Sequence, residues 1–437
     1  MKYHQPKGTY DILPKQLKLE DHWKTSDKWQ YLEKLIHELC KVYGLSEIRT
    51  PIFESTDLFI RSVGDASDIV SKEMYSFEDK GKRPISLRPE GTASTIRSFV
   101  ENHLEQHGQD HKLYYIGPFF RYDRPQAGRY RQFHQFGVEC IGRADPFQDA
   151  EMIDMLLEFY KKLGINNLTV LINSVGDSES RANYSEALKS YLQPYFEKLS
   201  KESQERFFKN PLRILDTKDE NDQLIIAEAP TLEQFLSENA KKHFEQVCDC
   251  LTSLGISYKI DPKLVRGLDY YNKTVFEIQS SALGAQNTIG AGGRYDGLLK
   301  KLGGPDLPSI GFATGIERVL HTMAAQNCKF PDSSNPFYFI IGLGEKTHKK
   351  SFELLSYLRH KGVPSELYIK SHKIQKGLEQ ALHENAEYCI IIGEDELAKE
   401  VLQIKNLKTR QNQEIQISSA VYHLTQTWET EKKLKHS

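Results

Sequence analysis

The segment from Arg131 to Glu139, RQFHQFGVE, places chemically different side chains at alternate positions. In a β-strand, alternate residues point to opposite faces of the sheet. One face would carry Phe133, Gln135 and Glu139, and a ring, an amide and a carboxylate together suit the floor of a binding pocket. The other face suits sheet packing and would carry His134, Phe136, Val138 and Cys140. The pattern predicts a pocket on the first face, and a strand with one solvated face is the alternative that it leaves open.

The stretch before this strand is basic and aromatic. Four arginines lie within eleven residues, with a single acid, Asp123, among them: Arg121, Arg124, Arg129 and Arg131. They are interleaved with the rings of Tyr122, Tyr130 and Phe133. Guanidinium groups bind phosphates through paired hydrogen bonds, and aromatic rings stack on nucleotide bases. The composition is typical of a site for an anion or a nucleotide, and a solvated basic loop is the alternative.

A third candidate segment is SIGFATGIERVLHTM, in which a strand meets a helix that should begin near Gly315. Arg318 would then lie in the first helical turn, where the helix dipole disfavours a cation. A neighbouring acid, Glu317, would compensate for that charge. A bound polyphosphate would also compensate, because the helix N–H groups and Arg318 would bind it together.

Two further patterns are weaker than they look. His103, His107 and His111 recur every four residues, but Gly108 interrupts the helix, and no carboxylate accompanies them in a metal-binding signature. The glycines of GAGGRYDGLL, residues 290–299, do not open a strand–helix–strand unit, so they do not indicate a dinucleotide site. The sequence therefore predicts no metal site made by protein side chains.

Composition bounds the class of protein. The chain has 437 residues, 58 lysines and arginines against 60 acids, and a net charge of −2. Its apolar runs are far shorter than the roughly 20 residues of a membrane-spanning helix, and its N-terminus has no hydrophobic signal segment. None of the six cysteines forms a CxxC pair. We therefore expect a cytoplasmic protein with reduced thiols and no membrane partner.

The surrounding pattern predicts the elements that position these segments. We expect a helix over 27–43, a hairpin over 74–88, a helix from Thr92 to about His103, and two strands within 113–142. Residues 173–258 are mainly helical and charged, as in an insertion. The polar stretch 326–336 resembles a linker, and strands alternate with helices beyond it. The predicted organisation is a catalytic domain over 1–325, the linker, and an α/β domain over 337–437.

These segments together resemble the class II aminoacyl-tRNA synthetases, and in detail the histidyl-tRNA synthetases. FRYDRPQAGRYRQFHQFGVE is similar to motif 2 of the class, and SIGFATGIERV to motif 3. KGTYDILP and LRPEGTAS are similar to the opening of the family and to its amino-acid-binding segment. LVRGLDYYNKTVFE and GGRYDGLL are similar to its two histidine-specific segments. The resemblance spans essentially the whole chain, and LVRGLDYY is its most specific part.

The resemblance implies a histidine pocket in the catalytic domain. The substrate α-amino group would be held by the side chains and backbone of Glu90, Gly91, Thr92 and Gln135. Glu139 and Tyr271 would bind the two imidazole nitrogens, and Tyr270 and Tyr295 would line the pocket. Arg266 would also belong to the histidine-binding residues.

The resemblance also implies an ATP site. Arg121 would bind the α-phosphate, and Arg266 would lie across that phosphate, so that both are catalytic. Phe133 would stack on adenine, and Arg129 and Arg318 would reach the terminal phosphates. Mg²⁺ would accompany ATP.

The implied fold is α+β: an antiparallel sheet with flanking helices and a helical insertion, followed by an α/β domain that binds the anticodon. The implied activity is a histidine–tRNA ligase, acting as a homodimer on L-histidine, ATP and histidine tRNA. Two alternatives remain. One is the histidine-sensing, non-catalytic regulatory relative of these enzymes, which generally lacks the C-terminal domain. The other is a synthetase for glycine, proline or threonine, whose substrates have no imidazole for Glu139 to bind.

Overall fold

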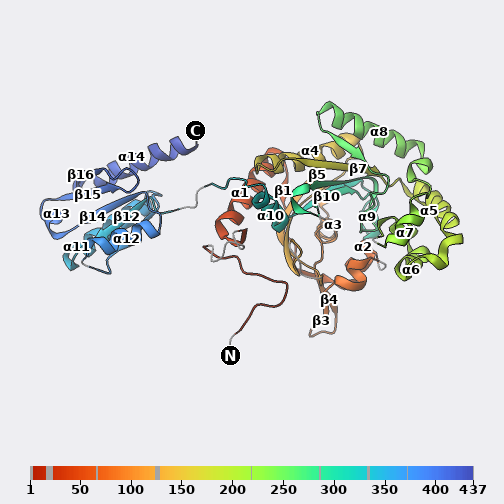
Figure 1. Ribbon diagram of the computed structural model, residues 1–437, viewed down its shortest axis with the longest axis horizontal. Coiled ribbons are helices and arrows are strands. Elements are labelled where there is room, and N and C mark those ends of the chain that lie inside the picture. Colours follow the sequence, from red (N-terminus) through yellow and green to blue (C-terminus); the bar gives the residue numbers. More distant parts are fainter. Residues whose placement is uncertain are drawn as a thin grey trace. The chain divides into compact units, whose positions relative to one another are not determined.

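The computed structural model describes residues 3–15, 23–64, 67–123, 128–217, 219–284, 287–331, 335–371 and 373–436. The chain forms two compact units, Met1–Phe330 and Pro331–Ser437 (Figure 1). Arg124 and part of the expected linker lie outside the described residues. Within the described part of the chain, no helix is long and apolar enough to cross a membrane.

The larger unit is built on an eight-stranded sheet with the order β1-β5-β6-β11-β10-β9-β7-β8. Neighbouring strands are antiparallel except at the two outer pairs, β1 with β5 and β7 with β8, which are parallel. The expected antiparallel sheet is thus confirmed. The strands are β1 Ser46–Glu47, β5 His111–Phe120, β6 Gln132–Ile141, β7 Leu168–Ser174, β8 Tyr258–Ile260, β9 Asn272–Ser280, β10 Thr288–Arg294 and β11 Ser309–Gly315.

The two faces of β6 are as predicted. Phe136, Val138 and Cys140 are buried in the main core, whereas Phe133 and Gln135 line a cavity. The register sets Glu139 opposite Gly311 of β11. A Cβ at Gly311 would lie 2.2 Å from a carboxylate oxygen of Glu139, so only glycine leaves room for that side chain.

Helices cover the sheet and build the core. Helix α1, Ser26–Val42, buries Trp29, Leu32, Ile36 and Leu39 at helical spacing, and it ends before Gly44 at φ 71°. Its N-cap is Thr25, so the helix begins at Ser26, one residue before the predicted start. The other long helices on this core are α4 Pro146–Lys162, α8 Glu238–Ser253 and α10 Ile316–Ala325.

A small three-stranded sheet, ordered β2-β4-β3, contains the predicted hairpin. Its strands are β2 Phe53–Ser55, β3 Ser76–Glu78 and β4 Pro84–Leu87, and the adjoining helices are α2 Thr56–Val63, η2 Ile69–Glu73, α3 Thr92–Glu101 and η3 Leu104–His107. Helix α3 ends two residues before the predicted His103, because His103 has a left-handed φ of 51°.

The segment between β7 and β8 is helical and has a hydrophobic core of its own. Figure 1 shows α5, α6 and α7 gathered at one end of the larger unit. The elements are α5 Ser178–Leu192, η4 Gln193–Lys198, α6 Lys201–Lys209, η5 Pro211–Asp216, α7 Glu220–Ile226 and η6 Leu232–Phe235. We call residues 175–236 the insertion. Two short elements of the larger unit complete the set, η7 Ser281–Leu283 and α9 Leu298–Lys301.

The smaller unit is an α/β domain with a mixed sheet of order β13-β12-β14-β15-β16. Strand β12 is parallel to β13 and β14, and the last two pairs are antiparallel. The alternation of strands and helices predicted this class, but not the final hairpin and helix. The elements are β12 Tyr338–Gly342, α11 Glu345–His360, β13 Ser365–Tyr368, α12 Ile374–His383, β14 Tyr388–Ile392, α13 Glu394–Ala398, β15 Val401–Asn406, β16 Asn412–Gln416 and α14 Ile417–His436.

Candidate active site

A cavity of about 270 Å³ opens over the centre of the large sheet. Its walls come from β6, β10, β11, the start of α10 and the loop before β9. Six residues that the sequence singled out line it: Arg121, Arg129, Phe133, Gln135, Arg266 and Arg318. Four guanidinium groups around one cavity make it strongly attractive to a polyanion.

Arg121 is one of the four arginines that line this cavity. Its Nε donates to the Pro89 carbonyl at 2.9 Å, and its guanidinium carbon lies 5.4 Å from the centre of the Phe133 ring. Burial lowers the pKa of Arg121, while the carboxyls of Glu73 and Glu90 act in the opposite direction. The side chain is therefore a fixed cation whose desolvation an incoming anion would offset.

Arg318 and Arg129 line the same cavity. Helix α10 begins after Gly315, as predicted, which places Arg318 in the first turn. Its Nη1 donates to the Thr288 carbonyl at 2.6 Å, and Arg129 pairs with Asp123 at 3.1 Å. Burial lowers the pKa of Arg318, and the charge of Arg129 lowers it further. Two neighbouring cations at a helix N-terminus are suited to a phosphate chain.

Glu317 has a separate task. Its carboxylate accepts the backbone N–H of His134 at 2.8 and 3.0 Å and the hydroxyl of Tyr10. It therefore ties α10 to β6.

Arg266 belongs to the loop between β8 and β9 and pairs with Glu277. Its Nε is buried and has no hydrogen-bond partner among the described residues. The amide oxygen of Gln135, in the same cavity, is likewise buried and without a donor in the described part of the chain. Unsatisfied buried polar atoms are rare in native proteins, and at a cavity wall they indicate groups that a ligand would pair.

A buried carboxylate, Glu139, lies beyond this cavity with 1% of its surface exposed. One carboxylate oxygen accepts from the hydroxyls of Thr92 at 2.7 Å and Tyr115 at 3.3 Å, and the other accepts from Tyr295. Burial raises the pKa of the Glu139 carboxyl to about 8, although the hydrogen bonds from Tyr295 and Thr92 lower it. Such a group is poised to exchange a proton or accept a hydrogen bond near neutral pH.

Glu90, Gly91 and Thr92 form the turn into α3. The Glu90 carboxylate accepts the backbone N–H groups of Thr92 at 2.8 Å and Ala93 at 2.9 Å. Glu90 is buried, with 4% of its surface exposed. The Tyr270 hydroxyl lies 3.5 Å from it. Burial raises the pKa of Glu90, and those two N–H groups lower it.

The three tyrosines expected around the histidine pocket make different contacts. Tyr295, expected to line the pocket, donates to Glu139, as Tyr115 does. Tyr271 instead packs against Tyr270, with ring centroids 4.7 Å apart, and burial raises its pKa to about 12. All three rings join one apolar cluster with α3 and α9.

Tyr115 is a site residue that sequence reasoning missed. Its ring fills the space beside two glycines, because a Cβ at Gly91 or Gly137 would lie 2.2 or 2.3 Å from it. The period-two pattern of LYYIGPFF could have assigned Tyr115 to one face of its strand. The register then sets Tyr115 opposite Gly137, on the face of β6 that carries Glu139. The sequence also gave no sign of Glu73, which lines the cavity and whose pKa burial raises.

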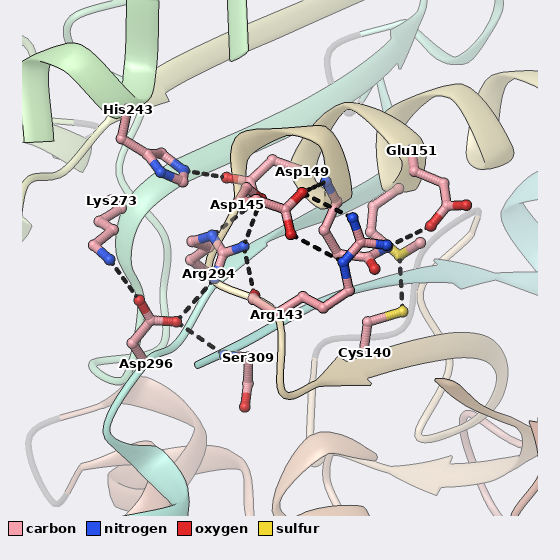
Figure 2. Close-up of polar contacts among 12 residues, drawn as sticks. Cys140, Arg143, Asp145, Asp149, Glu151, His243, Lys273, Arg294, Asp296 and Ser309 are labelled. Carbon is pink, nitrogen blue, oxygen red and sulfur yellow. Dashed lines mark hydrogen bonds and ion pairs between the residues drawn. The ribbon is translucent and has the colours of Figure 1, made fainter. Parts of the chain in front are cut away.

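The two sequence neighbours of Tyr295, Arg294 and Asp296, belong to an ionic cluster (Figure 2). Arg294, fully buried, donates to Asp149 at 2.7 Å and to Asp296 at 3.1 Å. Asp296 in turn accepts the backbone N–H of Ser309 at 2.9 Å and pairs with Lys273 at 2.8 Å. The backbone before and after Tyr295 is therefore held, which orients its hydroxyl toward Glu139.

Two family models match successive parts of the chain. The family model of histidyl-tRNA synthetase matches residues 19–319, and that of the anticodon binding domain matches residues 338–427. A histidine–tRNA ligase of Protochlamydia amoebophila is 51% identical over 407 residues, which cover 93% of this chain and 96% of that protein. One from Geobacillus is 47% identical over 427 residues, covering 97% and 99%.

A solved structure agrees with the sequence relatives. Apo histidyl-tRNA synthetase from S. aureus matches with a TM-score of 0.83 at 38% identity, covering 97% of this chain and 100% of that one. The chain therefore belongs to the histidyl-tRNA synthetase family.

Proposed function

We propose that this protein activates L-histidine with ATP to histidyl-adenylate and transfers histidine to the 3′ end of histidine tRNA. One observation carries the proposal. A buried carboxylate surrounded by hydroxyls, Glu139, lies next to a cavity lined by Arg121, Arg266 and Arg318. The first feature suits an imidazole, and the second suits a triphosphate.

Histidine would bind with its ring toward Glu139. The carboxylate accepts from one ring nitrogen, and a tyrosine hydroxyl, that of Tyr271, pairs with the other. Tyr270 and Tyr295 enclose the ring. The α-amino group lies toward Glu90 and Gln135, with Gly91 and Thr92 forming the turn beside it, and the donor-free amide oxygen of Gln135 supports this placement.

ATP would occupy the basic cavity. Phe133 stacks on adenine, Arg121 and Arg266 bind the α-phosphate from two sides, and Arg129 and Arg318 bind the terminal phosphates. Glu73 and Asp123 also line the cavity, and their carboxylates are oxygen donors of the kind that Mg²⁺ takes beside phosphates. When bound with ATP, Mg²⁺ supplies charge neutralisation for the departing pyrophosphate.

The chemical step is an in-line attack of the histidine carboxylate on the α-phosphorus, which releases pyrophosphate. Two anions meet, and negative charge builds on the non-bridging oxygens of the phosphorus. Arg121 and Arg266 stabilise that charge from fixed positions, so little reorganisation is needed. No side chain acts as a covalent nucleophile. The terminal ribose hydroxyl of the tRNA then attacks the carbonyl carbon of the mixed anhydride, which forms the histidyl ester and releases AMP.

The remaining assignments concern organisation and partners. We assign catalysis to residues 1–325 and anticodon binding to residues 337–437 beyond the linker. The segment of about 173–258, which contains the insertion defined above and helix α8, interrupts the catalytic domain. We also propose a homodimer, which exposed apolar side chains of the small sheet support, Phe53 being 55% exposed and Phe77 50%. The proposed location is the cytoplasm, where tRNA is charged.

The regulatory alternative predicts histidine binding without chemistry. It is less well supported, because the match to the anticodon-binding family covers residues 338–427 and the close relatives are named as ligases.

Amino-acid-dependent exchange of pyrophosphate into ATP separates the candidates. We expect exchange with histidine and none with glycine, proline or threonine, followed by charging of a histidine tRNA transcript. Histidine binding without exchange would support the regulatory relative instead.

A further inference from the structure

The loop between β8 and β9 brings Arg266 and Tyr271 to the candidate site, and the insertion holds that loop. At its centre is Asp269. One of its carboxylate oxygens, Oδ1, accepts hydrogen bonds from Arg213 Nε at 3.0 Å and Asn210 Nδ2 at 3.0 Å. Both donors belong to the insertion. The Arg213 side chain is 8% exposed and that of Asp269 is 23% exposed, so this ion pair is partly shielded from water.

Further insertion groups bind the loop backbone. Arg213 Nη2 donates to the carbonyl of Gly267. Arg181, on α5, donates from Nη1 to the carbonyls of Tyr271 at 2.9 Å and Asp269 at 3.4 Å. Guanidinium groups of the insertion thus bind the loop next to Arg266 and at Tyr271.

The guanidinium groups are anchored in the insertion and not in the central sheet. Arg213 is flanked in η5 by Leu212 and Ile214, and both are buried in the separate core of the insertion. That core also includes Tyr184, one helical turn after Arg181 on α5. A shift of the insertion would therefore move the loop with it.

The opposite side of Asp269 is closed by the end of α2. The Asp269 N–H donates to the Val63 carbonyl at 3.2 Å. A Cβ at Gly64, where φ is 97°, would lie 2.2 Å from Asp269 Oδ2. The carboxylate therefore lies between the insertion and the end of α2. A movement of either one relative to the other would change the position of Asp269.

We propose that Arg213 is a positioning residue for histidine activation, which sets the geometry of the loop that carries Arg266 and Tyr271. The inference rests on the proposed function of those two residues. A buried ion pair is weak evidence for stability, but it specifies one arrangement of its neighbours. A misplacement of about 1 Å can cost roughly 10²-fold in rate even when the mutation lies far from the chemistry. The insertion would therefore govern the activation step, although none of its residues need touch ATP.

The test is histidine-dependent pyrophosphate exchange by the full-length protein with Arg213→Ala and Arg213→Lys. We expect Arg213→Ala to lower kcat/KM for histidine by about 10- to 100-fold. The KM for ATP should stay within about twofold of the parent, because Phe133 and Arg318 lie outside the loop. For Arg213→Lys we expect a kcat/KM for histidine between that of the parent and that of Arg213→Ala. An ammonium can still pair with Asp269, but it cannot donate to Asp269 and to the Gly267 carbonyl with the geometry of a guanidinium.

Two comparisons separate positioning from loss of stability. Gln204→Ala removes the amide that donates to the carbonyls of Phe196 and Leu199 at 3.1 Å inside the insertion, and it should keep parental kinetics. Arg213→Ala with Asp269→Asn should be no worse than the more impaired single variant, because both act through one contact. If Arg213→Ala does not fold, Asp269→Asn alone provides the kinetic readout.

Parental histidine kinetics in a folded Arg213→Ala or Asp269→Asn variant would overturn the proposal. Arg266→Ala, measured in parallel, separates this failure from a failure of the proposed function. If Arg266→Ala also activates histidine normally, the role of the loop itself is wrong. If only the Arg213 variants are normal, the loop role stands and the positioning role is rejected.

Discussion

The hydroxyl of Thr92 donates a 2.7 Å hydrogen bond to the carboxylate of Glu139, and so joins the first turn of α3 to the middle of the sheet. Thr92 itself follows the Glu90 carboxylate, which accepts its backbone N–H. Two buried acids are thereby held on the two sides of one threonine. We infer that the histidine pocket is organised before substrate arrives, and this lowers the cost of ordering it on binding.

Tyr115→Phe should weaken histidine use. The variant loses one hydroxyl that donates to Glu139, and a hydrogen bond to a charged group contributes about 1.5–3 kcal/mol. Because the observed distance is a long 3.3 Å, we expect the lower end, about a tenfold rise in the histidine KM. Tyr114→Phe is the matched control, since the Tyr114 hydroxyl pairs with His37 at 2.8 Å, away from the site. Equal effects of the two variants would remove Tyr115 from the pocket.

Arg266→Ala should lower turnover by about 10²–10³-fold, as expected for a cation that stabilises charge mainly in the transition state. Histidine binding should remain broadly intact. Glu277, which pairs with Arg266, keeps a hydrogen-bond donor in this variant, because it also accepts from the Thr288 hydroxyl at 2.8 Å. Single-turnover formation of adenylate and histidine titration measure the two effects separately. Near-normal adenylate formation would contradict the assigned role.

A chain that ends near Asn335 should keep histidine-dependent pyrophosphate exchange and lose most tRNA charging. The larger unit contains every residue that lines the basic cavity, and the smaller unit has its own core. Exchange and charging are measured on the same preparation, after melting and sedimentation show that it is folded and in the parental oligomeric state. Equal losses in both reactions would count against the division of labour.

The pH dependence of stability should differ between the parent and Glu139→Gln. The folded pKa of Glu139 is raised to about 8, whereas an unfolded glutamate has a pKa of about 4.3. The folded chain holds the proton more tightly, so this contribution is fully present below pH ~4.3 and is lost as pH rises through ~8. Between these two pH values, each pH unit lowers the contribution of Glu139 to the free energy of unfolding by up to about 1.4 kcal/mol.

We therefore expect the melting temperature of Glu139→Gln, relative to the parent, to rise between pH 5 and pH 8. Glu78→Gln, which changes an exposed carboxyl on β3, is the control and should run parallel to the parent. Parallel profiles for all three proteins would show that Glu139 does not hold a proton in the folded state.

The sequence predicted the local parts of this site and missed contacts between distant segments. Strand periodicity placed Gln135 and Glu139 on one face, and the helix start at Gly315 placed Arg318 in the first turn. Periodicity carries no information on pairs such as Tyr295 with Glu139, which are 156 residues apart in sequence.

The same limit explains what was missed around the loop and at the C-terminus. The contact of Arg213 with Asp269 spans 56 residues and crosses from the insertion to the catalytic unit, so no local pattern indicates it. The hairpin of β15 and β16 was missed because its residues are mostly polar and its outer strand is exposed, apart from Ile415. An edge strand of this kind lacks the alternation that identifies a half-buried one.

The central claim is that Glu139 recognises the imidazole, and Glu139→Gln tests it most directly. The amide keeps the shape but cannot become charged, as the carboxyl does above its pKa of about 8, and it can present a donor where the ring needs an acceptor. We measure the Michaelis constants for histidine and ATP in pyrophosphate exchange, with a melting curve of the same sample. We predict a rise of roughly 10²-fold in the histidine constant, equivalent to about 3 kcal/mol for a buried charged hydrogen bond, and an ATP constant within about twofold of the parent. A folded variant with unchanged histidine kinetics would contradict the claim.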